Sequence, residues 1–169
     1  VGMVLTMVVQ ASSATFAIAL IMCSKGWITF DLAAALVLGG NIGTCITPII
    51  ASVSGNVMAK RAAAGHLMFN LLGSVWALAL YRPYMKLISW ITTGCVGDPN
   101  ALYTYASSAD PSTVAALSDG RLDPSVDGNE ALIANFAAMQ YYVSFGLSMF
   151  HTVFNLINIG VMIWFTKFY

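Results

Sequence analysis

The sequence predicts an all-α integral membrane protein. Its composition, its long apolar stretches and the polar breaks inside them all favour a chain folded in lipid. Of the 169 residues, 59% are hydrophobic and 8% are charged, and the mean hydropathy is +0.79, far from the composition of soluble domains. Seven basic and seven acidic residues cancel, and no basic stripe with interleaved aromatics occurs. Nucleic-acid binding is therefore excluded as a function class. The apolar stretches are 1–24, 30–54, 61–81 and 131–166, with a shorter one at 84–96.

Residues 1–24 contain two apolar arms separated by the polar cluster Gln10-Ala11-Ser12-Ser13-Ala14-Thr15. Each arm of roughly ten residues would be about 15 Å long as a helix, which is half the hydrocarbon thickness. This pattern predicts a re-entrant helical hairpin whose tip lies at the membrane midplane. Ser12 or Ser13 is expected to cap the second arm and leave the next backbone N–H groups unpaired. From the residues alone, the cluster is equally consistent with small polar residues that let two helices pack closely.

Residues 30–54 predict a broken helix, because Gly39-Gly40-Asn41-Ile42-Gly43-Thr44 interrupts the apolar stretch. Each glycine weakens a helix by about 1 kcal/mol relative to alanine. Thr44, or Thr47 before Pro48, is expected to cap a new helix. Irregular backbone at this depth survives only where it is buried in protein or lines a wet cavity.

The other segments complete one transmembrane repeat over residues 1–96. Residues 61–81 predict a plain spanning helix, 84–96 a short or interfacial helix, 97–130 an acidic solvated loop, and 131–169 a C-terminal transmembrane helix. Lys60, Arg61 and Lys167 are assigned to the cytoplasmic side by the positive-inside rule. The chain begins inside an apolar stretch without an initiator methionine, so we expect it to be a fragment of a longer protein.

Two helices share the pattern H-x-x-F-N-L, with His66 and Asn70 in one and His151 and Asn155 in the other. Residues four apart share a helix face, and polar side chains in a membrane are expected to face protein. These four side chains either hydrogen-bond across helices or line a solute path. No acid is placed to orient either histidine within the spans, so an enzyme is the least expected function.

The polar cluster could bind an anion and a cation together. The N-terminus of the second arm would carry a partial positive charge suited to an oxyanion. The oxygens of Gln10, Ser12, Ser13 and Thr15 are hard neutral ligands that suit sodium, and such sites occur at the midplane of secondary transporters. A sodium-coupled anion carrier is one coherent outcome of this pattern.

The cluster at 10–15, the glycine motif at 39–44, the stretch Ala59-Lys60-Arg61 leading to His66 and Asn70, and the later H-T-x-F-N at 151–155 occur in a characteristic order. Together they resemble the bacterial branch of the type II sodium/phosphate cotransporter family, over about residues 1–80 and 130–169. The resemblance implies two inverted repeats, each with a re-entrant hairpin and a broken helix, of which this chain is the second.

The resemblance also implies particular site residues. Gln10, Ser12, Ser13 and Thr15 would hold phosphate and Na+, and Asn41, Gly43 and Thr44 would line the opposite wall. Three positions depart from the family pattern, namely Ala11, Cys45 and Pro48.

The resulting hypothesis is a sodium-coupled inorganic phosphate symporter that works by alternating access, with Na+ as the coupling ion and no other cofactor. It is expected to be a multi-pass protein of the cell inner (plasma) membrane. Its expected partners are phosphate, Na+, the lipid bilayer, and the missing N-terminal repeat or a second copy. Two alternatives remain: a structural or regulatory module in which the breaks are helix-packing surfaces, and a passive anion channel.

Overall fold

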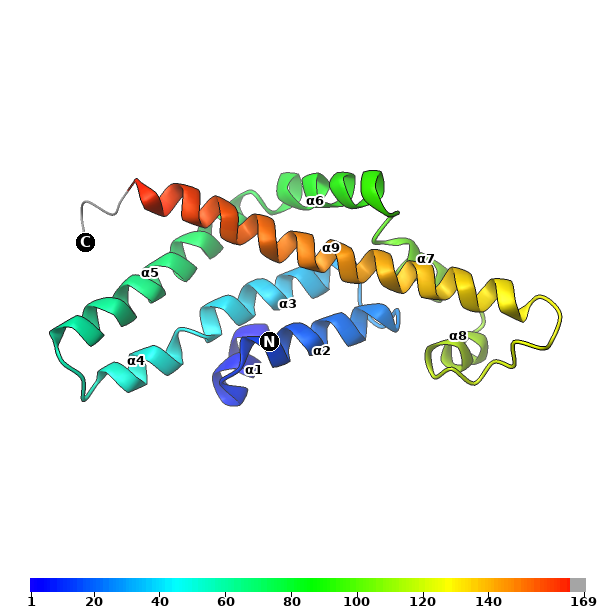
Figure 1. Cartoon of the computed structure of the whole chain (residues 1–169), viewed down its shortest axis with the longest axis horizontal. Helices are drawn as coiled ribbons and strands as arrows, with labels where there is room; N and C mark the ends of the chain where they lie inside the picture. The colour runs from blue at the N-terminus through cyan, green and yellow to red at the C-terminus, as the bar shows by residue number, and fades with distance from the viewer. Residues whose placement is uncertain (165–169) are drawn as a thin grey trace.

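In the computed structural model, residues 1–164 are described, and their regular secondary structure is helical, without a strand (Figure 1). Lys167, used above for orientation, and the end of the predicted 131–169 helix lie outside the described residues. The predicted all-α class is therefore confirmed. The helices are α1 (Gly2–Val9), α2 (Ser12–Ser24), α3 (Phe30–Gly43), α4 (Ile46–Ser52), α5 (Val57–Ala79), α6 (Tyr81–Cys95), α7 (Ala101–Ser108), α8 (Pro111–Ser118) and α9 (Asn129–Ile163).

A sharp turn at Gln10 joins α1 to α2 and makes the two helices a hairpin. Gln10 has left-handed backbone angles, with φ 56° and ψ 26°, and its N–H donates to the Thr6 carbonyl at 2.7 Å. Ala11 is extended and precedes the first residue of α2. The predicted cap at Ser12 or Ser13 is wrong by one or two positions. Ala11 occupies the N-cap instead and has no side-chain acceptor to offer the helix.

The predicted broken helix is present, but its break lies at the end of the glycine motif rather than at the glycines. α3 continues through Gly43, and the break falls at Thr44 and Cys45. Neither threonine caps the new helix: the Thr44 hydroxyl donates to the Gly40 carbonyl at 3.0 Å, and Thr47 lies inside α4.

The glycines of α3 instead allow α1 to approach closely. A Cβ atom at Gly43 would lie 2.5 Å from the Met3 carbonyl oxygen, and one at Gly39 would lie 3.0 Å from the Met3 nitrogen. The low helix propensity of glycine is overridden here because missing side chains let two backbones come together.

In the described part of the chain, three helical segments are long and apolar enough to span a membrane: α3 with α4 over Phe30–Ser52, α5, and α9. α5 starts four residues before the predicted 61–81 span, because the Asn56 side chain accepts a hydrogen bond from the Ala59 N–H at 2.9 Å. α6 follows α5 after Leu80.

The segment 97–130, expected to be a solvated loop, contains α7 and α8. Asp110 explains the second of these helices. Its carboxylate accepts hydrogen bonds from the Ser112 and Thr113 backbone N–H groups, and Pro111 takes the first helical position. The loop was predicted from the acidic charge of this segment, and the helix-capping pattern of Asp110 followed by Pro111 was not taken into account.

α9 runs the length of the molecule, with α6 along one side and α8 near its N-terminal end (Figure 1). The Tyr84 hydroxyl of α6 donates to the Phe150 carbonyl of α9 at 2.6 Å. The buried rings of Phe30, Phe150 and Phe154 bring α3 and α9 into one core.

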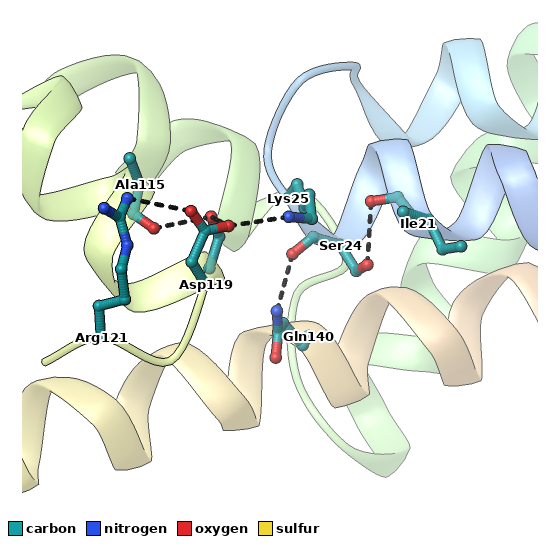
Figure 2. Close-up of polar contacts among 8 residues, drawn as sticks. Ile21, Ser24, Lys25, Ala115, Asp119, Arg121 and Gln140 are labelled. Carbon is teal, nitrogen blue, oxygen red and sulfur yellow. Dashed lines mark hydrogen bonds and ion pairs between the residues drawn. The ribbon is translucent and has the colours of Figure 1, made fainter.

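Polar contacts fix the far end of the hairpin to α8 and α9 (Figure 2). Lys25, directly after α2, forms an ion pair with Asp119 at 3.1 Å, and Arg121 pairs with the other carboxylate oxygen at 3.0 Å. The Gln140 amide of α9 donates to the Ser24 carbonyl at 3.0 Å. The hairpin is thus tied at the end opposite its tip.

Candidate functional site

A cavity of about 270 Å³ lies beside the hairpin tip, where α2, α3 and α9 meet. The first turns of α2 form one wall, the second half of α3 another, and α9 contributes a histidine. The lining residues are Ser12, Ser13, Phe16, Val37, Asn41 and His151.

The amide of Asn41 is the polar group in this cavity that most needs a ligand. The residue is 9% exposed, and its Nδ2 has no hydrogen-bond partner among the described residues. A buried donor left unpaired costs about 1–3 kcal/mol. An oxygen acceptor bound in the cavity would remove that cost.

The N-terminus of α2 adds further donors to the same cavity. Ser12 and Ser13 are the first two residues of α2, so their backbone N–H groups have no acceptor within the helix. Both serines line the cavity. The partial positive charge at the start of α2 favours an anion at this position.

Thr15 lies behind the cavity wall rather than on it. Its hydroxyl and that of Thr6 are hydrogen-bonded at 2.6 Å, and both residues are buried. A Cβ atom at Gly40 would lie 3.2 Å from the Thr6 hydroxyl oxygen, so this pair sits directly on α3. The pair fastens the two hairpin arms together.

The structure therefore brings together three of the seven expected site residues, Ser12, Ser13 and Asn41. Gln10 is exposed at the tip, while Gly43 and Thr44 are used in packing and in bonding within α3.

The two H-x-x-F-N-L helices use their asparagines in the same way. Asn70 Nδ2 donates to the His66 carbonyl at 3.0 Å, and Asn155 Nδ2 donates to the His151 carbonyl at 2.8 Å. Both of these bonds lie within one helix, whereas a second side-chain hydrogen bond joins Asn70 of α5 to Cys45 in the break before α4.

Of the two histidines, only His151 lines the cavity. Its ring centroid lies 5.8 Å from that of Phe16. Phe16 and Val37 were not expected from the sequence. Helical spacing could have found them, since Phe16 lies four residues after Ser12 and Val37 four before Asn41.

The cavity walls carry no carboxylate, lysine or arginine. Within residues 1–164, no group of three or more His, Cys, Asp or Glu side chains is placed to hold a metal ion. The site therefore offers uncharged donors, hydroxyl and amide oxygens, and one imidazole.

Helices long and apolar enough to span a membrane, together with a short-armed hairpin, indicate a helical membrane protein, and the cavity at the hairpin tip is its candidate site. The sequence profile of the Na+/Pi-cotransporter family matches residues 1–93. The chain belongs to this family. The matched part contains the hairpin, the broken helix, α5 and most of α6.

Individual relatives support the same assignment. The chain is 38% identical over 99 residues to "Uncharacterized protein YqeW" of Bacillus subtilis, a match covering 59% of this chain and 31% of that protein. It is 28% identical over 88 residues to "Putative inorganic phosphate export protein YjbB" of Salmonella typhimurium, covering 52% and 16% respectively. The protein of the same name in Escherichia coli K12 is 28% identical over 89 residues, with 53% and 16% coverage. The chain thus spans less than a third of these relatives' length, and no solved structure matches it.

Proposed function

We propose that this chain forms one half of a sodium-coupled inorganic phosphate symporter, with phosphate bound in the cavity at the hairpin tip. The observation that carries the proposal is that Asn41, whose buried amide nitrogen has no partner among the described residues, lines the same cavity as the first turn of α2. Together these groups offer several N–H and O–H donors to one tetrahedral oxyanion. The family membership favours phosphate among oxyanions.

In this proposal, Na+ is held by neutral oxygens near the tip. Gln10, Ser12 and Ser13 are the side chains free to supply them, whereas the Thr15 hydroxyl is engaged with Thr6. Thr15 then acts as a support for the tip rather than as a ligand.

The opposite wall comes from an inverted repeat of the same protein or from a second copy of this chain. Gln10 lies exposed at the tip, where such a wall would cover it. The tip then lies near the midplane of the inner (plasma) membrane, with α1 and α2 as the arms of a re-entrant hairpin. The greater length of the curated relatives agrees with a second repeat.

The test is uptake of radiolabelled phosphate into proteoliposomes of the full-length protein, with and without a sodium gradient. Asn41→Ala and Ser13→Ala are each expected to weaken apparent phosphate affinity by about tenfold or more, since hydrogen bonds to a charged ligand contribute about 1.5–3 kcal/mol. Ser24→Ala is the matched control, because Ser24 lies at the other end of α2 and bonds to the Ile21 carbonyl.

Each alternative predicts a different result in the same assay. Phosphate flux that is indifferent to sodium would support a passive anion channel. Variants that reduce stability or assembly without altering phosphate affinity would support a structural module. If both Asn41→Ala and Ser13→Ala left the phosphate affinity unchanged, the proposal that phosphate binds in this cavity would be wrong.

Phosphate export is a second candidate, favoured by the name of the YjbB relatives. It uses the same cavity but moves phosphate outward. Release of preloaded phosphate from inside-out and right-side-out vesicles separates the two directions. Net flux toward the outer face under physiological gradients would favour the exporter.

A further inference from the structure

A second cavity, of about 420 Å³, lies between α3 and α6 and shares no lining residue with the cavity at the hairpin tip. It is formed by the first turn of α3, the first three turns of α6 and the residue before α7. Its walls hold two cationic side chains and one carboxylate. The lining residues are Asp31, Tyr81, Arg82, Met85, Lys86, Ser89 and Asn100.

Arg82 and Lys86 face this cavity together and lack acidic partners. They lie four residues apart on α6, so they share one helix face. Within residues 1–164, the only ion pairs join Asp119 to Lys25 and to Arg121. The two cations therefore repel each other without a carboxylate in contact with either.

The N-terminus of α3 adds positive potential to the same place, whereas the N-terminus of α6 adjoins the C-terminus of α5 at Leu80, so those two end charges offset each other. The first turns of α3 and α6 meet, because the Tyr81 hydroxyl donates to the backbone carbonyl of Asp31. Helix N-termini disfavour nearby cations and favour anions. The Asp31 carboxylate offsets part of this potential, and the lining side chains retain a net charge of +1 from two cations and one acid.

The cavity lies close to the expected boundary of the hydrocarbon. Arg82 comes three residues after Ala79, the last residue of the spanning helix α5. Trp90, farther along α6, is 75% exposed, and tryptophan is enriched where lipid meets water. Ligands from the aqueous phase and from the lipid headgroup layer would both reach this position.

We propose that this cavity binds a phosphate group between Arg82 and Lys86, at a site separate from the transport cavity. The Arg82 guanidinium offers paired N–H donors, Lys86 a compact positive charge, and Ser89 a hydroxyl. An anionic lipid headgroup and free inorganic phosphate share this chemistry. The site does not depend on the proposed transport function.

The experiment measures two ligands on the full-length protein in neutral detergent. Asn41→Ala is included throughout to weaken binding at the hairpin tip. Inorganic phosphate is measured by equilibrium dialysis, and bound phosphatidylglycerol is measured against phosphatidylcholine by native mass spectrometry. The variant is R82Q/K86Q, and the matched control is K60Q/R61Q, which removes the same charge from the first turn of α5, away from the cavity.

We expect R82Q/K86Q to weaken one of the two ligands by at least about tenfold and K60Q/R61Q to leave it within about twofold of the parent. Loss of phosphate binding identifies the free ion, and loss of phosphatidylglycerol identifies the headgroup. If R82Q/K86Q weakens neither ligand more than K60Q/R61Q does, the proposal is overturned.

Asp31→Asn separates ligand recognition from general damage to the fold. Removing this carboxylate raises the net charge of the lining side chains, so the affinity for the same ligand is expected to increase several-fold. A variant that only disturbs packing would not bind more tightly. Unchanged or weaker binding in Asp31→Asn would overturn the electrostatic basis of the site.

Discussion

At the residue scale, the Thr6 and Thr15 pair shows how a polar residue in lipid can support a site without belonging to it. Both hydroxyls are buried, and each is the other's partner at 2.6 Å. One comes from each arm of the hairpin, so the bond holds together the helices on either side of the tip. The cavity residues Ser12 and Ser13 lie between them in the sequence.

A double-mutant cycle tests this support. Thr6→Val or Thr15→Val alone leaves one buried hydroxyl unpaired and is expected to destabilise the protein by about 1–3 kcal/mol. Because the double variant removes both hydroxyls, it is expected to be less destabilised than the sum of the single variants. The measurement is thermal or denaturant unfolding in detergent. Strict additivity would contradict a direct bond between the two side chains.

Residue identity alone could predict part of the site. The cavity is lined by three of the expected residues, Ser12, Ser13 and Asn41. Polar residues within apolar membrane segments face the protein interior or a cavity, because lipid offers them no hydrogen-bond partners. Thr15 was expected beside them, but its helical position directs it toward Thr6 and Gly40. His151 enters the cavity through tertiary packing of α9, which no local pattern determines.

At the element scale, the same residue types support opposite interpretations. Three glycines in α3 indicated a helix break, yet Gly39 and Gly43 admit the backbone of α1, and Gly40 admits the side chains of the Thr6 and Thr15 pair. Helix propensity describes a helix in isolation. The role of these glycines depends on the packing of α1 against α3, a tertiary contact that the local sequence does not predict. The short helix α8 was locally predictable from Asp110 and Pro111, and the acidic composition of its surroundings obscured it.

The attachment of α8 to the hairpin is expected to depend on pH. The hydrogen bond and charge of Lys25, followed by the charge of Arg121, lower the pKa of Asp119. A lowered pKa in the folded state stabilises this attachment fully at neutral pH, and the contribution is lost as pH falls below about 4. The side chains are partly exposed, so salt should weaken the effect.

Hydrogen exchange of the α8 backbone amides, corrected for intrinsic rates, checks this dependence between about pH 3 and pH 7. In the parent protein, α8 is expected to lose protection as the pH falls. Asp119→Asn should lower protection at neutral pH and reduce that loss. The part that remains comes from the Asp110 cap of α8, because hydrogen bonds from the Ser112 side chain and the Thr113 backbone also lower the pKa of Asp110. Asp127→Asn, at an exposed acid of the same segment, is the control and should behave as the parent does.

At the scale of the whole molecule, α9 is longer than the membrane is thick. Its 35 residues make a helix of about 52 Å, against about 30 Å of hydrocarbon. The N-terminal part of α9 packs beside α7, through Phe136 and Tyr105, and its Gln140 bonds to the end of the hairpin. This end is therefore expected to project into water with α7 and α8.

Cysteine accessibility tests this placement. Glu130 and Ile159 are both exposed in the structure, but we expect water around the first and lipid around the second. With the native cysteines replaced, Glu130→Cys should react with a membrane-impermeant maleimide in vesicles of suitable orientation, and Ile159→Cys should remain unreactive. Equal labelling of both would contradict the placement. Detergent-solubilised, denatured protein supplies the control for full reactivity.

The contact between α1 and the glycines of α3 also limits how this molecule can move. Separating α1 from α3 would expose backbone N–H and C=O groups at their contact. It would also leave a gap along the glycines, where no side chain is present to fill the space. The hairpin and α3 are therefore expected to travel as one rigid body. On the α9 side, the rings of His151 and Phe16 lie against each other in the cavity lining, and they can separate without exposing backbone. We therefore expect the cavity to open by displacement of α9, while the hairpin stays packed against the glycines of α3.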